Sequence, residues 1–438
     1  MNKTVEKGKT MLVDGPASVT VESGKAEVFG SIIGPAGKVV IREGKRLPFA
    51  VDETTTFDIS LGDNATAEEI DGSTVPQSWT EPCKELLNLQ TRPITALVLG
   101  TVDSGKTSFC TYLVNKVLSA KRKVAVLDGD MGQSDIGPPS TVAYAFVTKP
   151  ITDLFNLQAR NAFFVGDTSP SGVTDKVIEG LTSLKKEILA NNPEFVVINT
   201  DGWVEGECAV TYKIQLVKEL SPDVIFCIQQ KGELTPFLNI LEKSKTIVVE
   251  SPQVIAQRDA EKRRKLREAA YIKYLRTPKI QSLSLAWLKV EGNELFGLCK
   301  IRMNMRQAGK IYGLLGMKPL HLSELGDKIC VVIGRRRWIN PDNIKNVEEV
   351  TKKRVVVTRK GEEEGLLAGI YNSDKKFLGI GIVQEIDYLR KTLKICTPVL
   401  GDISAITLGK IKLDKKMKEL PAITEENHID FASFRKLF

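Results

Sequence analysis

The sequence predicts an α/β protein in which a central domain, with a parallel β-sheet and helices on both faces, lies between two all-β domains. Three observations lead to this prediction. Short β-rich pieces separated by Gly, Asp and Pro turns fill residues 9–61, apolar strands alternate with helix-length segments after Pro93, and short strands with Gly-containing turns return from about residue 280. Strand–helix alternation is typical of βαβ units, whereas successive short strands are typical of all-β domains.

Length and composition agree with a folded protein of several domains. The chain has 438 residues, of which 42% are apolar and 26% are charged, and this composition is ordinary for globular proteins. At roughly 100 to 200 residues per domain, we expect three domains, at residues 1–80, 81–280 and 281–438. The stretch GDNATAEEIDGSTVPQ at residues 62–77 interrupts the first β pattern and is predicted to be a linker or an exposed loop.

Each predicted strand is a short run of apolar and β-branched residues bounded by turn residues. In the first domain these runs are ASVTV, KAEVFGSII, KVVI and TTTFDISL. In the central domain they are ITALVLG, KVAVLDGD, EFVVINTDG and DVIFCIQQ. In the last domain they are KICVVIG, KRVVVTRKG, LLAGIYN, FLGIGIVQEI, TLKICTPV and AITLGKIKL.

Cysteine and histidine usage excludes several classes of site. The seven cysteines form no CxxC pair, which favours a reduced, cytoplasmic protein without a disulfide or zinc framework. The only histidines are His321 and His428, so we expect a general base to be a carboxylate. The N-terminus lacks an apolar signal core, and no apolar run approaches the about 18 residues of a membrane span, so we expect no membrane association.

Residues 100–107, GTVDSGKT, match the phosphate-binding pattern GxxxxGK[ST] and stand between the strand ITALVLG and the helix-like SFCTYLVNKVLSA. In this pattern backbone N–H groups surround phosphate, the lysine reaches the terminal phosphates and the hydroxyl binds magnesium. The sequence has neither a second lysine at the start of the loop nor an NKxD guanine motif, which favours ATP as the nucleotide. The predicted ATP-binding residues are Gly100, Thr101, Val102, Asp103, Ser104, Gly105, Lys106, Thr107 and Ser108.

Two carboxylates, Asp128 and Asp130, stand at the end of the strand that follows this loop and its helix. Residues two apart on an extended strand point to the same side, and like charges this close need a cation or a proton-transfer role. One carboxylate can therefore lie near Mg²⁺ while the other points toward an acceptor hydroxyl. Asp201, which ends another apolar strand, is an alternative magnesium-associated carboxylate.

Residues 258–279 carry nine Lys and Arg against three Asp and Glu, a net charge of +6 out of +8 for the whole chain. A charge run of this kind is commonly a solvated helix face. Asp259 is a suitable N-cap, so we expect Arg258 just before a helix and Arg263 inside it, which lets both side chains reach one phosphate group. An apolar stripe of Leu266, Ala270 and Tyr274 is expected to dock this helix.

Five segments follow one another along the chain: GTVDSGKTS, DGDMGQSDIGPPST, VGDTSPSG, INTDGWVEG and the Arg-rich run that begins at Arg258. Taken in this order they resemble the polynucleotide 5′-hydroxyl kinase family, and the chain is similar to an archaeal-like member of it. The family includes RNA kinases related to tRNA splicing, pre-mRNA cleavage and rRNA processing. The resemblance spans roughly residues 95–280 and implies ATP- and Mg²⁺-dependent transfer of the γ-phosphate to the 5′-hydroxyl of RNA, with DNA left open as a second acceptor.

The resemblance implies roles for the catalytic and metal-binding residues. Lys106 binds phosphate and Asp130 accepts the proton of the hydroxyl. Asp128 supports the magnesium region together with Thr107, and either Thr168 or Ser169 approaches the metal.

It also implies roles at the substrate side. Arg258 and Arg263 belong to a lid and contact the transferred phosphate. Trp203 forms part of a clasp on the terminal nucleotide, although the residue pattern alone fits a core aromatic better. Gln133 is either a substrate contact or a loop amide. Asp201 departs from family members that have an uncharged residue there, which argues against an essential catalytic role.

Two other functions stay open at this stage. A nucleotide-bound scaffold for RNA processing needs no aligned base, and a small-molecule P-loop kinase or ligase needs neither the flanking β domains nor the basic lid. The expected partners are the 5′ ends of RNA or single-stranded polynucleotides, and the sequence indicates no particular protein partner.

Overall fold

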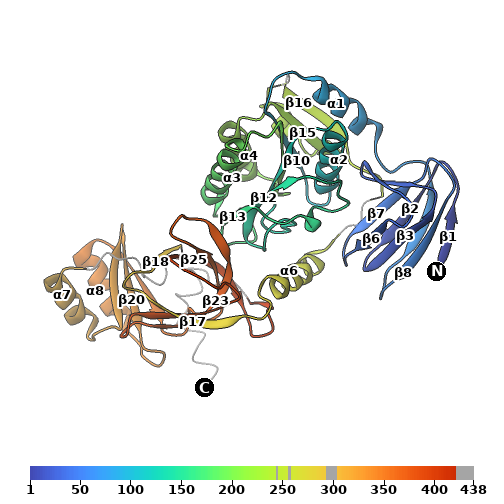
Figure 1. Cartoon of the computed structure of the whole chain (residues 1–438). Helices are drawn as coiled ribbons and strands as arrows, with labels where there is room; N and C mark the ends of the chain where they lie inside the picture. The colour runs from blue at the N-terminus through green and yellow to red at the C-terminus, as the bar shows by residue number, and fades with distance from the viewer. Residues whose placement is uncertain (243–244, 255–257, 293–302, 421–438) are drawn as a thin grey trace. The chain divides into compact units, whose positions relative to one another are not determined.

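The computed structural model describes residues 1–242, 245–254, 258–292 and 303–420. The chain divides into two compact units, Met1–Ala269 and Ala270–Phe438, and Figure 1 labels many of their elements. The domain boundaries expected after residues 80 and 280 stay predictions. Within the described ranges, no helix has the length and apolar character needed to cross a membrane.

The first unit begins with two antiparallel sheets, as the sequence predicts. They pack face to face, because Phe49 of one sheet and Phe57 of the other form an edge-to-face ring pair with centroids 5.8 Å apart. In strand order, one sheet contains β1 (Asn2–Val5), β8 (Thr55–Leu61), β3 (Ala17–Ser23) and β6 (Lys38–Ile41). The other contains β5 (Ser31–Ile33), β4 (Ala26–Val28), β7 (Arg46–Ala50), β2 (Lys9–Asp14) and β9 (Ala67–Asp71).

Strand β9 corrects the expectation of a linker at residues 62–77. It pairs antiparallel with β2, with Thr10 opposite Ile70, and the Thr10 hydroxyl donates to the carbonyl of Gly72 at 2.6 Å. The sequence AEEID has little of the apolar alternation that marks a strand. It is held at a sheet edge by backbone pairing, which side-chain patterning does not reveal.

The rest of the first unit is built on a seven-stranded sheet. All four central segments predicted as strands are confirmed, and they lie in a parallel arrangement. The two strands at one edge, β12 and β13, run antiparallel to their neighbours. The strand order is β13 (Asn161–Phe164), β12 (Thr141–Val147), β11 (Val124–Gly129), β14 (Phe195–Thr200), β10 (Ile94–Gly100), β15 (Val224–Gln229) and β16 (Thr246–Glu250).

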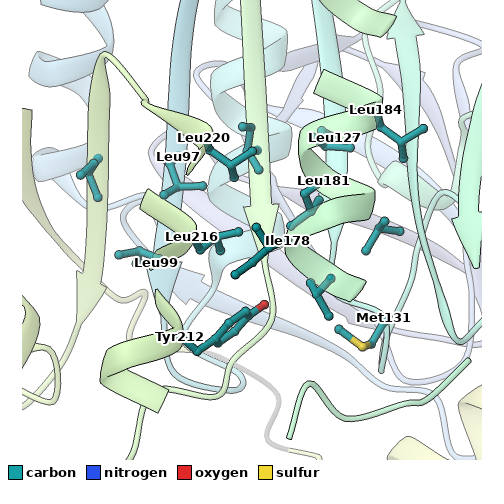
Figure 2. Packing of buried hydrophobic residues seen from close by; sticks show 14 of the residues in the cluster. Leu97, Leu99, Leu127, Met131, Ile178, Leu181, Leu184, Tyr212, Leu216 and Leu220 are labelled. Atoms are coloured by element: carbon teal, nitrogen blue, oxygen red, sulfur yellow. The ribbon is translucent and has the colours of Figure 1, made fainter. Parts of the chain in front are cut away.

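Helices cover both faces of this sheet, as predicted. Alternation along β15 shows the two faces: Ile225 and Cys227 belong to the apolar cluster that α3 and α4 complete, whereas the ring of Phe226 lies 4.7 Å from that of Phe109 in α2. Figure 2 shows the first of these clusters, with leucines of the strands and of both helices in contact. Among the described residues up to Glu250, the helices are α1 (Gln77–Asn88), α2 (Lys106–Ser119), α3 (Thr174–Leu189), α4 (Glu207–Leu220), the short α5 (Thr235–Leu238) and the 3₁₀ turn η1 (Leu154–Asn156).

The second unit is β-rich, as predicted, but its described residues also include the helices α7 (Met305–Leu315) and α8 (Pro341–Thr351), which the sequence prediction did not include. Helix α8 begins at an Asn340 cap, whose side chain accepts from the N–H of Asp342, and it connects two parallel strands, β20 and β21. A parallel pair requires such a crossover. The small sheet and helices are β19 (His321–Leu325), β20 (Lys328–Ile333), β21 (Arg354–Arg359), α7 (Met305–Leu315) and α8. The larger sheet contains β17 (Lys279–Ser284), β24 (Thr392–Thr397), β23 (Phe377–Asp387), β22 (Leu366–Tyr371), β25 (Ala405–Leu413), β18 (Lys289–Gly292) and β26 (Glu419–Leu420).

Candidate active site

The phosphate-binding loop leads from the end of β10 into α2, at the edge of the sheet where the carboxyl ends of the parallel strands meet. Gly100 has no room for a side chain, because a Cβ there would lie 2.5 Å from Ser104 Oγ and 2.9 Å from the carbonyl oxygen of Ile228. Gly105 has φ of 95°, a left-handed conformation that favours glycine. The loop therefore presents its backbone at the N-terminus of a 14-residue helix, which is a favourable position for an anion.

Lys106 is buried, and its ammonium group lies over its own loop. Its Nζ donates to the carbonyl oxygen of Thr101 at 2.6 Å. Burial lowers the pKa of Lys106 to about 8, and the carboxylate of Asp130 opposes that shift. A phosphate group in the loop would favour the charged form of Lys106 for the same reason that Asp130 does.

Asp128 lies within the protein, with hydrogen bonds to both carboxylate oxygens. Asn199 Nδ2 donates to Oδ1 at 3.0 Å, and the N–H of Asp135 donates to Oδ2 at 2.8 Å. Asn199 Nδ2 also lies 3.5 Å from the Thr107 hydroxyl, so one amide connects the two residues predicted to serve magnesium. Burial raises the pKa of Asp128 to about 7, and the neighbouring carboxylates of Asp135 and Asp130 act in the same direction.

Asp130 occupies a different environment from Asp128, although both were expected on the same side of one strand. Strand β11 ends at Gly129, so the two-residue repeat does not extend to Asp130. Its side chain is partly exposed, and its Oδ1 accepts from the N–H of Gln133 at 2.9 Å. Burial raises the pKa of the Asp130 carboxyl, and the charge of Lys106 opposes part of that rise.

Two cavities meet at Asp130. A small one of about 100 Å³ follows residues 102–108 of the phosphate-binding loop and is also lined by Arg258. A larger one of about 470 Å³ lies between the loops after β11, β13 and β14, and Trp203 forms part of its wall. Val102, Asp130 and Gln133 line both. We call them the P-loop cavity and the Trp203 cavity.

Trp203 both packs on the core and faces the Trp203 cavity. The ring is half-buried and stacks on Tyr212 of α4, with centroids 5.9 Å apart and planes 26° apart. It packs against the α3–α4 cluster with one side. The two interpretations of this residue, core aromatic and substrate clasp, are therefore geometrically compatible.

The carboxylate of Asp201 forms an ion pair with a lysine inside the protein. Lys213, which is fully buried, places Nζ 2.8 Å from Asp201 Oδ2, and the Tyr212 hydroxyl donates to the same oxygen at 2.9 Å. The N–H of Trp203 donates to Oδ1 at 3.0 Å. Burial lowers the pKa of Lys213, and the Asp201 carboxylate opposes that shift. These bonds shape the turn that presents Trp203.

Thr168 and Ser169 lie together on the wall of the Trp203 cavity. Their N–H groups donate to Asp167 Oδ1 at 2.7 and 3.2 Å. The Asp167 carboxylate therefore holds the turn formed by the two residues that follow it. Thr107 lines the P-loop cavity instead. Neither Thr168 nor Ser169 lines the cavity that Thr107 lines, and a metal contact of either residue stays a prediction.

Gln133 is bonded as a loop amide. Its Nε2 donates to the carbonyl oxygens of Gly132 at 2.6 Å and of Arg263 at 3.3 Å. Because the side chain also lines both cavities, a contact with substrate stays a prediction.

The basic segment forms helix α6 (Ala260–Tyr274). Asp259 caps it, since its Oδ1 accepts from the N–H of Lys262 at 2.7 Å, and Arg258 precedes the helix as predicted. Arg258 and Arg263 both bond to Asp103 of the phosphate-binding loop. The fully buried position of the helix is Tyr271, which the expected stripe of Leu266, Ala270 and Tyr274 did not include.

Sequence reasoning missed three groups of residues at this site. Asn199 faces Asp128 because β11 and β14 pair in parallel with these two residues in register. Arg42 and Lys45 of the N-terminal sheets bond to Asp135, Lys45 at 2.9 Å, and Gly44, Lys45 and Arg46 line the P-loop cavity. The only signal in the sequence was a turn rich in basic residues, IREGKR.

Comparison with known proteins adds an independent line of information. Residues 100–277 match the family described as mRNA cleavage and polyadenylation factor CLP1 P-loop. A polyribonucleotide 5′-hydroxyl-kinase of Pyrococcus furiosus is 31% identical over 355 residues, which cover 80% of this chain and 96% of that protein. A protein of the same name from Methanocaldococcus jannaschii is 26% identical and covers 77% of this chain and 91% of its own length.

A solved structure shows the same fold. The Clp1p chain in a complex with Pcf11p superposes with a TM-score of 0.64 at 13% identity, covering 94% of this chain and 97% of that one. At this identity the likeness concerns the fold alone.

The buried pair of Lys213 and Asp201 generates a test of stability. Lys213→Met should lower the free energy of unfolding by about 3–5 kcal/mol, because it leaves the Asp201 charge buried without its partner. Urea denaturation measures this loss. Lys218→Met, on the exposed side of the same helix, is the matched control and should change the free energy of unfolding by less than about 0.5 kcal/mol. Equal losses for the two variants would contradict the assignment.

Proposed function

Because the chain belongs to the polyribonucleotide 5′-hydroxyl-kinase family, we propose that it transfers the γ-phosphate of ATP to the 5′-hydroxyl group of RNA. The family relationship supports nucleotide use by the P-loop. The acceptor, the use of Mg²⁺ and the roles of individual residues are parts of the proposal.

The position of Asp130 between the two cavities is the observation that carries this function. A kinase must bring a phosphate donor and an acceptor hydroxyl to opposite sides of one group that can take a proton. Asp130 lines the P-loop cavity and the Trp203 cavity. Of the candidate carboxylates, Asp128 is enclosed and Asp201 is paired with Lys213, so Asp130 is the one suited to this task.

The donor side consists of the loop, Lys106 and the magnesium region. Backbone N–H groups of the loop and the Lys106 ammonium hold the triphosphate. Thr107 would supply a hydroxyl ligand for Mg²⁺, and Asp128 would support that hydroxyl through Asn199. These oxygen donors fit Mg²⁺, which usually takes one or two protein ligands and completes its shell with phosphate and water. Bound Mg²⁺ would neutralise charge on the β- and γ-phosphate oxygens.

The chemical step is an in-line displacement. The 5′-hydroxyl oxygen forms a bond to the γ-phosphorus, the bond from that phosphorus to the β–γ bridging oxygen breaks, and ADP leaves. The hydroxyl proton passes to the Asp130 carboxylate. Arg258 and Arg263 stabilise the negative charge of the transferring group, an effect that in comparable enzymes is on the order of 10³ to 10⁵ in rate.

The acceptor side is the Trp203 cavity. Its size, its exposed indole face and the presence of Arg263 and Arg267 on the wall suit a terminal nucleotide followed by a phosphate. Stacking of a base on an aromatic ring is tolerant of base identity, so we propose that the 5′ end is recognised with little sequence preference. Thr168 or Ser169, on the wall of this cavity, is proposed to be the residue that would approach the metal.

The cellular setting is also a proposal. We propose the reduced, cytoplasmic setting that the sequence predicts, because its seven cysteines form no CxxC pair. RNA 5′ ends are the proposed partners there.

The function is tested by incubating the chain with γ-labelled ATP, Mg²⁺ and a single-stranded RNA that carries a 5′-hydroxyl. We expect label on the RNA, and no more than background for Lys106→Ala. Tight ATP binding without transfer to RNA, single-stranded DNA or duplex ends would instead support the scaffold. Transfer that unlabelled RNA fails to inhibit would support a small-molecule kinase.

Replacing the proposed base separates proton transfer from nucleotide binding. Asp130→Asn should lower the transfer rate by at least about 10²-fold, the lower range for a general base, while the affinity for ATP changes little. The rate is measured in single turnover and the affinity with a fluorescent ATP analogue. Asp175→Asn, an exposed carboxylate in the first turn of α3, should transfer at the wild-type rate. A nearly active Asp130→Asn would remove Asp130 from the mechanism.

Removing the Trp203 ring tests the acceptor cavity. Trp203→Ala should raise the KM for RNA by roughly 5- to 150-fold, the equivalent of about 1–3 kcal/mol of base stacking, and leave the KM for ATP unchanged. Trp203→Phe should recover part of the loss. Trp287→Ala, at an exposed indole of the second unit, serves as the control. A change in the KM for ATP alone would show that Trp203 acts at the nucleotide.

A further inference from the structure

Asp103 places a carboxylate within the phosphate-binding loop, where its charge has the same sign as the phosphates. It stands between Gly100 and Lys106 and has φ of 55°, a conformation that Asp adopts more readily than most residues. Its side chain is only 9% exposed. A carboxylate so placed needs cations that neutralise it before nucleotide can bind next to it.

The cations come from the start of the lid. The Arg258 backbone N–H donates to Asp103 Oδ2 at 3.0 Å, and its Nε and Nη2 donate to Oδ1 at 3.0 and 2.6 Å. Arg263 Nη1 lies 3.5 Å from Oδ2 and donates to the carbonyl oxygen of Arg258 at 2.5 Å. Both oxygens of one carboxylate are thus used by two arginines.

These contacts also determine where the two guanidinium groups point. Arg258 lines the P-loop cavity and Arg263 lines the Trp203 cavity, so Asp103 joins one arginine on each side of the proposed reaction. A guanidinium has five N–H donors. With Nε and Nη2 of Arg258 turned to Asp103, its Nη1 is left to reach a phosphate oxygen.

We propose that Asp103 is a positioning residue that fastens the start of α6 to the phosphate-binding loop and orients Arg258 and Arg263 for the transferring phosphate. The fastening belongs to the protein without nucleotide. The effect on transfer rests on the proposed function, so the two parts are tested separately.

Fastening is tested by limited trypsin digestion of the full chain without nucleotide, because the arginines and lysines of residues 260–267 become cleavable only when this segment opens. The initial rate of cleavage then follows the open population. Asp103→Asn should raise it about tenfold, the size expected for loss of a charge-assisted hydrogen bond. Glu261→Gln removes an exposed carboxylate of the same helix, paired with Lys265 at 3.0 Å, and should change the rate by less than about twofold.

Coupling between the partners distinguishes fastening from a general loss of structure. Arg258→Ala should itself raise the cleavage rate, and adding Asp103→Asn to it should change the rate by less than about twofold further. The proposal would be overturned if the double variant were cleaved at a rate that multiplies the increases of the two single variants. It would also be overturned if Asp103→Asn alone were cleaved at the wild-type rate. The thermal midpoints of the variants are measured alongside, and Asp103→Asn should keep that of the wild type.

Orientation is tested by steady-state kinetics. Asp103→Asn should lower kcat about tenfold with little change in the KM for ATP, and the loss should vanish in the Arg258→Ala background. A higher kcat or tighter ATP binding would mean that Asp103 competes with phosphate for the arginines, which contradicts a positioning role. If the wild-type chain transfers no phosphate, the proposed function fails, while the digestion still decides whether Asp103 fastens the lid.

Discussion

The parallel register of β11, β14 and β10 is the constraint on which the site depends. It places Asp128 beside Asn199 and brings Asn199 within reach of the Thr107 hydroxyl. A carboxylate buried this fully is costly unless its oxygens are bonded, and the Asn199 amide reaches one of these oxygens because the two strands are aligned. The same alignment brings the turns after β11 and β14 to one edge of the sheet, where Asp130 and Trp203 can face a common cavity. A slip of one residue would turn Asp128 to the other face.

Much of the fold could be predicted because it is encoded locally. Apolar runs of strand length alternate with helical segments, and the phosphate-binding pattern marks which strand precedes which helix. The start of α6 after Arg258 was equally predictable, because it depends on the local N-cap at Asp259. The strand β9 and the helices α7 and α8 were missed for the converse reason. The β9 sequence carries charges where a strand usually carries apolar residues, and α8 lies between strands whose own pattern suggested a purely β region.

Several residues of the candidate site could be named from the sequence, but their arrangement could not. Asp128 and Asp130 were expected on the same side of one strand, but β11 ends at Gly129, so Asp128 lies in the interior and Asp130 lines the cavities. The bonds of Asn199 to Asp128, of Lys45 to Asp135 and of Asp103 to the lid arginines each join residues that are far apart in the chain. No spacing rule connects such positions, because strand order and the packing of the N-terminal sheets decide them.

The turn Gly44–Arg46 extends the proposed catalytic region beyond the phosphate-binding domain, because it lines the P-loop cavity. The family match begins at residue 100, yet part of the wall of the P-loop cavity comes from this turn, and Lys45 and Arg42 bond to the residue whose N–H supports Asp128. The recognisable motif and the physical pocket therefore have different extents. A fragment that contained only the matched residues would keep the motif and lose one wall of the P-loop cavity. Two relatives with identical motifs can also differ in that wall, because the β-turn that forms it lies outside the compared motif.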